Sequence, residues 1–149
     1  MNRVELARDA FMRGFNCTQA VLSAFSEDLE LESATAARLA ECFGGTVCNR
    51  SMPCGALLGA AMVAGLYAGR SEPEDGAAKA RAERLRAWLY DAFSARFGGP
   101  GCRELLGADI TTAEGMAQAR ASGALLRCGE YVAYAAELTE RMLREDIPE

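Results

Sequence analysis

The feature that most constrains the fold is a run of nineteen residues without a charge, from Ser51 to Gly69. Within it Gly55 and Gly59 stand four residues apart, with alanines recurring at the same spacing beside them, so one face of a helix would carry only small side chains. Neighbouring helices can approach the backbone of such a helix closely. We therefore expect a buried central helix over about 54–69.

The same stretch is about as long as a membrane span. However, its first residues include Pro53, and most of its apolar side chains are small. Both features favour a helix buried inside a soluble domain over insertion in a membrane. Pro53 suits the beginning of a helix, where its missing N–H costs nothing, so Cys54 is expected at the start of the central helix.

The remaining sequence favours helices throughout. The chain of 149 residues fits a single domain, and its apolar residues are mainly Ala, Leu and Met, with few runs of Val and Ile. We expect an all-α, single-domain bundle of about five to seven helices over residues 1–149. Apolar spacing and capping residues predict helices over 2–13, 17–25, 33–43, 77–97 and 122–143, with shorter ones over 102–106 and 111–120.

The net charge of the chain and the composition of its first residues limit the classes of function that we expect. The net charge is −5 and no Lys/Arg cluster occurs, which argues against nucleic-acid binding. The first residues mix charged and apolar side chains and contain no apolar leader, so we expect a cytoplasmic location. The apolar content of the long helices makes a homodimer a further expectation.

The chain has six cysteines and no histidine. Because the cytosol keeps thiols reduced, six cysteines in a cytoplasmic protein point to metal or redox chemistry and not to structural disulfides. The absence of histidine excludes His-dependent triads and zincin-type metal sites. Sulfur is therefore the soft ligand available to a metal.

Three of the cysteines share one local setting. Cys17, Cys54 and Cys102 each follow a capping or helix-breaking residue and begin an apolar helical run. A helix start presents unpaired N–H groups and the positive end of the helix dipole, which stabilise a thiolate. This setting suits a metal or cluster ligand, whereas the alternative is that each cysteine is a small core residue.

The cysteines are widely spaced, and no C-x-x-C pair occurs. A site that uses Cys17, Cys54, Cys102 and Cys128 must therefore be assembled by the fold. Cys42 and Cys48 flank the loop that begins at Gly44-Gly45. They can be further ligands, a redox pair or packing residues, and we favour a role other than ligation.

Several segments carry a family resemblance. They are Phe15–Val21, Phe43-Gly44-Gly45, the CGAxxG motif at Cys54–Gly59, Cys102–Gly107 and Cys128. Together they resemble the C-GCAxxG-C-C family of redox-active proteins, which are frequently prokaryotic. The resemblance implies that Cys17, Cys54, Cys102 and Cys128 form the functional set, with an electron-transfer or redox role that involves an iron–sulfur cluster. Cys42 and Cys48 are not among the family's four recurring cysteines.

The resulting functional hypothesis is a cysteine-ligated metal centre, with an iron–sulfur cluster used for electron transfer or redox sensing with a partner protein. Two alternatives remain open at this point. One is a metal-free thiol–disulfide redox protein that uses the same cysteines. The other is a helical interaction module held by structural zinc.

Overall fold

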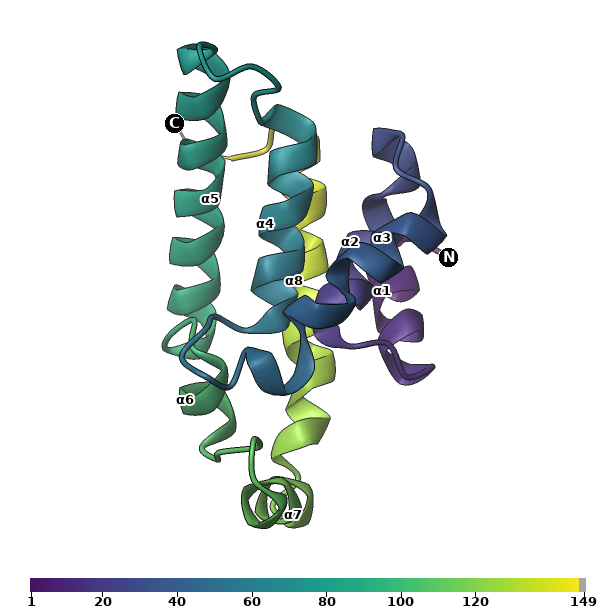
Figure 1. The fold of residues 1–149 in the computed structure, drawn as a ribbon, viewed down its shortest axis with the longest axis vertical. Coiled ribbons are helices and arrows are strands. Elements are labelled where there is room, and N and C mark those ends of the chain that lie inside the picture. Colours follow the sequence, from purple (N-terminus) through teal and green to yellow (C-terminus); the bar gives the residue numbers. More distant parts are fainter. Residues whose placement is uncertain (148–149) are drawn as a thin grey trace.

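A computed structural model describes residues 1–147 as an all-α bundle, as predicted (Figure 1). This part of the chain contains eight α-helices and no β-strand. The eight helices are one more than the upper figure of seven, and each corresponds to a segment for which the sequence predicts a helix. The bounds are α1 Arg3–Met12, α2 Cys17–Phe25, α3 Ser33–Ala40, α4 Gly55–Ala68, α5 Gly76–Phe97, α6 Cys102–Leu106, α7 Ala113–Ala121 and α8 Cys128–Leu143.

The predicted central helix is α4, which packs against α2, α5 and α8 (Figure 1). Its four regularly spaced alanines, at 56, 60, 64 and 68, are all buried. A Cβ atom added at Gly59 would lie 2.9 Å from the carbonyl oxygen of Thr18 and 2.9 Å from Cβ of Val21, both in α2. Gly59 therefore allows the backbones of α2 and α4 to approach closely, as its position in the sequence predicts. No helix in residues 1–147 is long and apolar enough to cross a membrane.

The start of α2 follows directly from its sequence. The Asn16 side chain accepts a hydrogen bond from the backbone N–H of Gln19 at 2.8 Å, and the Gln19 side chain accepts one from the backbone N–H of Asn16 at 3.0 Å. This reciprocal capping box satisfies two N–H groups that have no partner within the helix. It places Cys17 as the first residue of α2.

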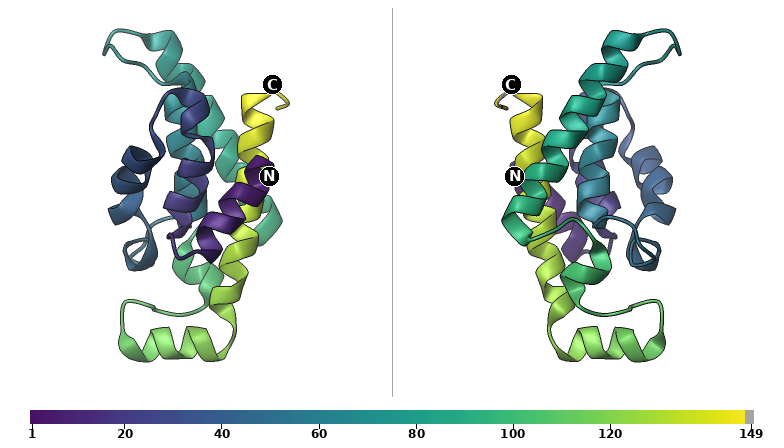
Figure 2. Two further views of the ribbon diagram at one scale, coloured as in Figure 1. Left: turned by 90° about the vertical axis from the view of Figure 1, so that its right-hand side faces the viewer. Right: turned by 90° about the vertical axis from the view of Figure 1, so that its left-hand side faces the viewer.

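The last helix differs from the prediction. Instead of beginning near residue 122, α8 begins at Cys128, after the 3-10 turn Ala124–Arg127. Gly123 adopts a left-handed conformation with φ of 77° and so separates α7 from this turn. Figure 2 shows α7 lying across the end of the bundle before the chain turns into α8. Cys128 therefore opens a helix and does not lie inside one.

An aromatic cluster joins α5 to α8. The ring centroids of Phe97 and Tyr131 are 4.8 Å apart in an edge-to-face arrangement, and those of Phe93 and Phe97 are 4.9 Å apart. Such pairs add to the stabilisation that apolar burial supplies. Because Tyr131 also borders the cavity described next, the cluster supports one wall of that cavity.

Candidate functional site

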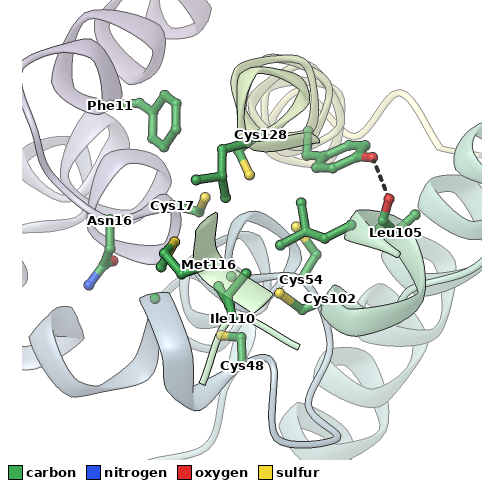
Figure 3. Close-up of a pocket in the computed structure, with 15 residues that line it drawn as sticks. Phe11, Asn16, Cys17, Cys48, Cys54, Cys102, Leu105, Ile110, Met116 and Cys128 are labelled. Atoms are coloured by element: carbon green, nitrogen blue, oxygen red, sulfur yellow. Dashed lines mark hydrogen bonds between the residues drawn. The ribbon is translucent and has the colours of Figure 1, made fainter. Parts of the chain in front are cut away.

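Five of the six cysteines line one cavity of about 240 Å³. The cavity lies where the N-terminal ends of α2, α4, α6 and α8 meet, beside the loop that precedes α4 (Figure 3). Its cysteines are Cys17, Cys48, Cys54, Cys102 and Cys128. The other lining residues are mostly apolar, including Phe11, Leu105, Leu106, Ile110, Met116 and Leu125. All six cysteines of the chain are free thiols.

The four cysteines singled out from the sequence come together, and all four stand at helix starts. Cys17, Cys102 and Cys128 are the first residues of α2, α6 and α8, and Cys54 is the N-cap of α4. Cys128 differs from the other three in its local setting, because the preceding residue, Arg127, ends a 3-10 turn and the N–H of Cys128 donates to the carbonyl oxygen of Leu125. The fold, and not sequence spacing, brings them to one place.

Backbone hydrogen bonds hold two of these helix starts side by side. The N–H of Cys54 donates to the carbonyl oxygen of Pro100 at 2.7 Å, and the N–H of Cys102 donates to that of Met52 at 3.3 Å. Pro53 and Gly101 form an isolated antiparallel bridge between them. The starts of α4 and α6 are thus joined directly, which positions Cys54 beside Cys102.

Burial dominates the ionisation of the thiols at Cys54 and Cys48. Burial raises the pKa of Cys54 to about 12, although hydrogen bonds from the N–H groups of Ala56 and Leu57 to its sulfur act in the opposite direction. Burial also raises the pKa of Cys48 to about 11, with a smaller contribution from Cys102. The helix start does supply donors to the Cys54 sulfur, as expected, but loss of water outweighs them, so this thiol stays protonated at neutral pH.

The pKa values of Cys17 and Cys128 shift in opposite directions because the two thiols interact with each other. A hydrogen bond with Cys128, together with burial, raises the pKa of Cys17 well above its usual value. The same hydrogen bond lowers the pKa of Cys128, and the positive charge of Arg127 lowers it further. Of this pair, Cys128 is therefore the more acidic thiol.

The two remaining cysteines, Cys42 and Cys48, differ in their position relative to the cavity. Cys42 is exposed and does not line the cavity. Cys48 is buried in the cavity wall, and its Sγ donates a hydrogen bond to the carbonyl oxygen of Phe43 at 3.1 Å. Sequence spacing treated these two cysteines alike, whereas the fold makes only Cys48 a neighbour of the other thiols.

Asn49 is a site residue that the sequence analysis missed. Its side chain is fully buried, and its Nδ2 lies 3.6 Å from the Sγ of Cys102 as a hydrogen-bond donor. This hydrogen bond lowers the pKa of Cys102, but burial has the larger effect and raises it. The signal in the sequence is only a polar residue next to a cysteine in a loop, which many exposed asparagines share.

The cysteine side chains around the cavity are of the chemical type that binds a soft metal ion or an iron–sulfur cluster. Thiolates are the ligands of iron–sulfur clusters and of structural zinc, and four of them stand in one largely apolar cavity. Within residues 1–147, however, no three cysteine or carboxylate side chains are already arranged to hold a metal ion. Binding therefore requires the thiols to lose their protons and turn toward a common centre.

The ionisation pattern predicts the order in which the cavity thiols react. With iodoacetamide at pH 8, we expect Cys128 to be alkylated first among the five cavity thiols and Cys17 and Cys54 to be the slowest. A thiol with a pKa of about 12 is ionised in about one molecule in ten thousand at that pH, and the thiolate is the reactive form. Mass spectrometry of each cysteine measures the order.

The Cys17→Ala variant provides the control for this experiment. It removes the S–H donor that stabilises the Cys128 thiolate, so alkylation of Cys128 becomes slower. Equal rates for Cys54 and Cys128 in the unmodified chain would contradict the assignment.

Comparison with known proteins gives one match. The family model described as "Putative redox-active protein (C_GCAxxG_C_C)" matches residues 15–142. No curated protein and no solved structure matches the chain. The matched range includes Cys17, Cys54, Cys102 and Cys128, the four cysteines at the helix starts around the cavity. The chain therefore belongs to the C_GCAxxG_C_C family of redox-active proteins.

Proposed function

We propose that this protein binds an iron–sulfur cluster through Cys17, Cys54, Cys102 and Cys128 and uses it for electron transfer or redox sensing in the cytoplasm. The supporting observation is that four thiols, each at the start of a different helix, line one mostly apolar cavity. When bound, the cluster would supply one-electron chemistry to a partner redox protein.

Backbone and side-chain groups around the cavity stabilise the thiolate form of its cysteines. The N–H groups of Ala56 and Leu57 donate to the sulfur of Cys54, and the Arg127 side chain favours the anionic form of Cys128. Such donors and charges offset part of the cost of burying negative sulfur. The apolar wall excludes water, which protects a buried centre and sets its reduction potential.

Protons must leave before the thiols can bind iron. Burial raises the pKa of Cys54 and Cys102, and the interaction with Cys128 together with burial raises the pKa of Cys17, so these thiols are protonated in the metal-free protein. Loading therefore releases protons and becomes more favourable as the pH rises. We expect tighter loading at pH 8.5 than at pH 6.5.

Anaerobic purification tests the proposal. We expect a coloured protein that contains iron and acid-labile sulfide in equal amounts and that gives a paramagnetic signal after a one-electron change. A colourless protein with bound zinc would overturn the cluster and support the structural-zinc alternative. A colourless protein without metal, after anaerobic reconstitution with iron and sulfide, would also overturn it.

A second candidate function is metal-free thiol–disulfide exchange. The observation that favours it is the hydrogen-bonded pair of Cys17 and Cys128, in which one sulfur is the more acidic. The Cys128 thiolate would attack a partner disulfide and release one partner thiolate. Cys17 would then attack the Cys128 sulfur and release the second, so that the partner disulfide is reduced as this pair is oxidised. A Cys17–Cys128 disulfide in the metal-free protein would support this function.

A further inference from the structure

Asn49 is a fully buried polar residue in the loop between Cys48 and the start of α4. Its side-chain Nδ2 donates to the carbonyl oxygen of Ala108 at 3.1 Å and lies 3.6 Å from the Sγ of Cys102. Its Oδ1 accepts the backbone N–H of Ile110 at 3.0 Å. Both ends of the amide are therefore occupied, as a buried polar group requires.

The hydrogen bond from Asn49 to the Cys102 sulfur offsets the shortness of the helix that begins at Cys102. Cys54 stands at the start of the fourteen-residue helix α4, where the backbone N–H groups of Ala56 and Leu57 lower the pKa of its thiol against the effect of burial. Cys102 begins α6, which has only five residues, and the hydrogen bond to its sulfur comes from the Asn49 side chain. A short helix contributes little dipole, so the sulfur of Cys102 depends on this amide.

The same amide holds the segment that carries Ile110, a residue of the cavity wall. Ala108 and Ile110 belong to the segment between α6 and α7, and Ile110 lines the cavity. The backbone of Asn49 is held as well, because Nε of Arg103 donates to its carbonyl oxygen at 3.0 Å. Asn49 thus joins three parts of the site: the loop after Cys48, the start of α6 and the wall at Ile110.

We propose that Asn49 is a positioning residue, whose amide holds the Cys102 sulfur toward the cavity and donates an N–H to it when the sulfur is a metal ligand. The inference rests on the proposed function for the identity of the bound centre. Partners of this kind orient a ligand, and their loss costs about 10- to 100-fold in metal affinity. An N–H donor to a ligand sulfur also withdraws electron density, which raises the reduction potential of a bound cluster.

The test compares two Asn→Asp variants of the full chain. Asn49→Asp keeps an oxygen that can accept the Ile110 N–H but removes the amide donor to the Cys102 sulfur and to the carbonyl oxygen of Ala108. Asn16→Asp is the control, because the Asn16 amide also donates to a backbone carbonyl oxygen, that of Glu41 at 3.1 Å, and aspartate caps a helix as well as asparagine does. Both variants replace an amide with a carboxyl group and lose a donor to a backbone carbonyl, and only Asn49→Asp removes a hydrogen bond to a cysteine.

Anaerobic titration with cobalt(II), followed by its sulfur-to-metal charge-transfer absorption, is the first measurement. We expect Asn49→Asp to bind cobalt about 10- to 100-fold more weakly than the unmodified chain, and Asn16→Asp to bind within about threefold of it. In reconstituted protein, the reduction potential of Asn49→Asp is expected to be more negative. The inference would be overturned if the two variants bound cobalt equally weakly, or if both kept the cobalt affinity of the unmodified chain.

The second measurement needs no metal. Alkylation of each cysteine in the metal-free protein should slow at Cys102 alone in Asn49→Asp, by about threefold to tenfold, because one hydrogen bond to the thiolate is lost. A purely structural role would change all five cavity thiols together, and that result would refute the positioning role. If the unmodified chain loads neither cobalt nor a cluster while Cys102 still responds selectively, the proposed function fails and the Asn49 contact stands.

Discussion

Replacing Cys54 with serine is expected to abolish the bound iron–sulfur centre and leave the fold intact. Cys54 is buried at the N-cap of α4, where the N–H groups of Ala56 and Leu57 act against burial to lower the pKa of its thiol. Serine favours the N-cap position, so the helix start is preserved. What is lost is the soft thiolate that iron and zinc require. Iron and sulfide content after anaerobic reconstitution measures the effect.

The chain provides two matched Cys→Ser controls. Cys42→Ser should keep the centre, because Cys42 is exposed and outside the cavity. Cys48→Ser should keep it as well, because four other thiols line the cavity and the Cys48 thiol is already bonded to the carbonyl oxygen of Phe43. Loss of the centre in Cys48→Ser with retention in Cys54→Ser would show that the ligand set is wrong.

The second large effect is expected at Gly59. Replacing Gly59 with valine should lower the free energy of unfolding by about 1–3 kcal/mol, which is typical of overpacking in a well-packed core. The added Cβ would lie 2.9 Å from the carbonyl oxygen of Thr18, which is backbone and cannot rotate away, so α2 must move. Urea unfolding followed by circular dichroism measures the change.

This substitution should also weaken metal loading, because α2 carries Cys17 and α4 begins beside Cys54. Separating the two helices separates two of the four thiols. Gly65→Ala is the control on the same helix, since no atom beyond the adjoining residues and the nearby backbone of α4 itself lies within 4 Å of the position of its added Cβ. We expect this variant to be more stable by about 0.5–1 kcal/mol, because alanine favours a helix more than glycine does. A Gly59→Val protein as stable as the unmodified chain would refute the close packing of α2 on α4.

Much of the fold was predictable because its signals are local. The uncharged run with small residues every fourth position identified the central helix, and α4 spans Gly55–Ala68 against the expected 54–69. Asn16 and Gln19 identified the start of α2, because a capping box involves only four neighbouring residues. The start of α8 was predicted wrongly, at about residue 122, because the apolar spacing continues through Gly123 and the 3-10 turn Ala124–Arg127, and only the left-handed backbone of Gly123 shows the break.

The sequence by itself determined where most of the helices lie, the capped start of α2 and, through the resemblance, which four cysteines form the functional set. Only the tertiary structure decided which thiols meet, since Cys17 and Cys128 lie at opposite ends of the chain and come together through the packing of α1, α2, α4 and α8. It also placed Cys48 inside the cavity and Cys42 outside, and it brought Asn49 to the sulfur of Cys102. The physical reason is that helix starts depend on neighbouring residues, whereas burial and its effect on thiol pKa depend on every segment that excludes water from the cavity.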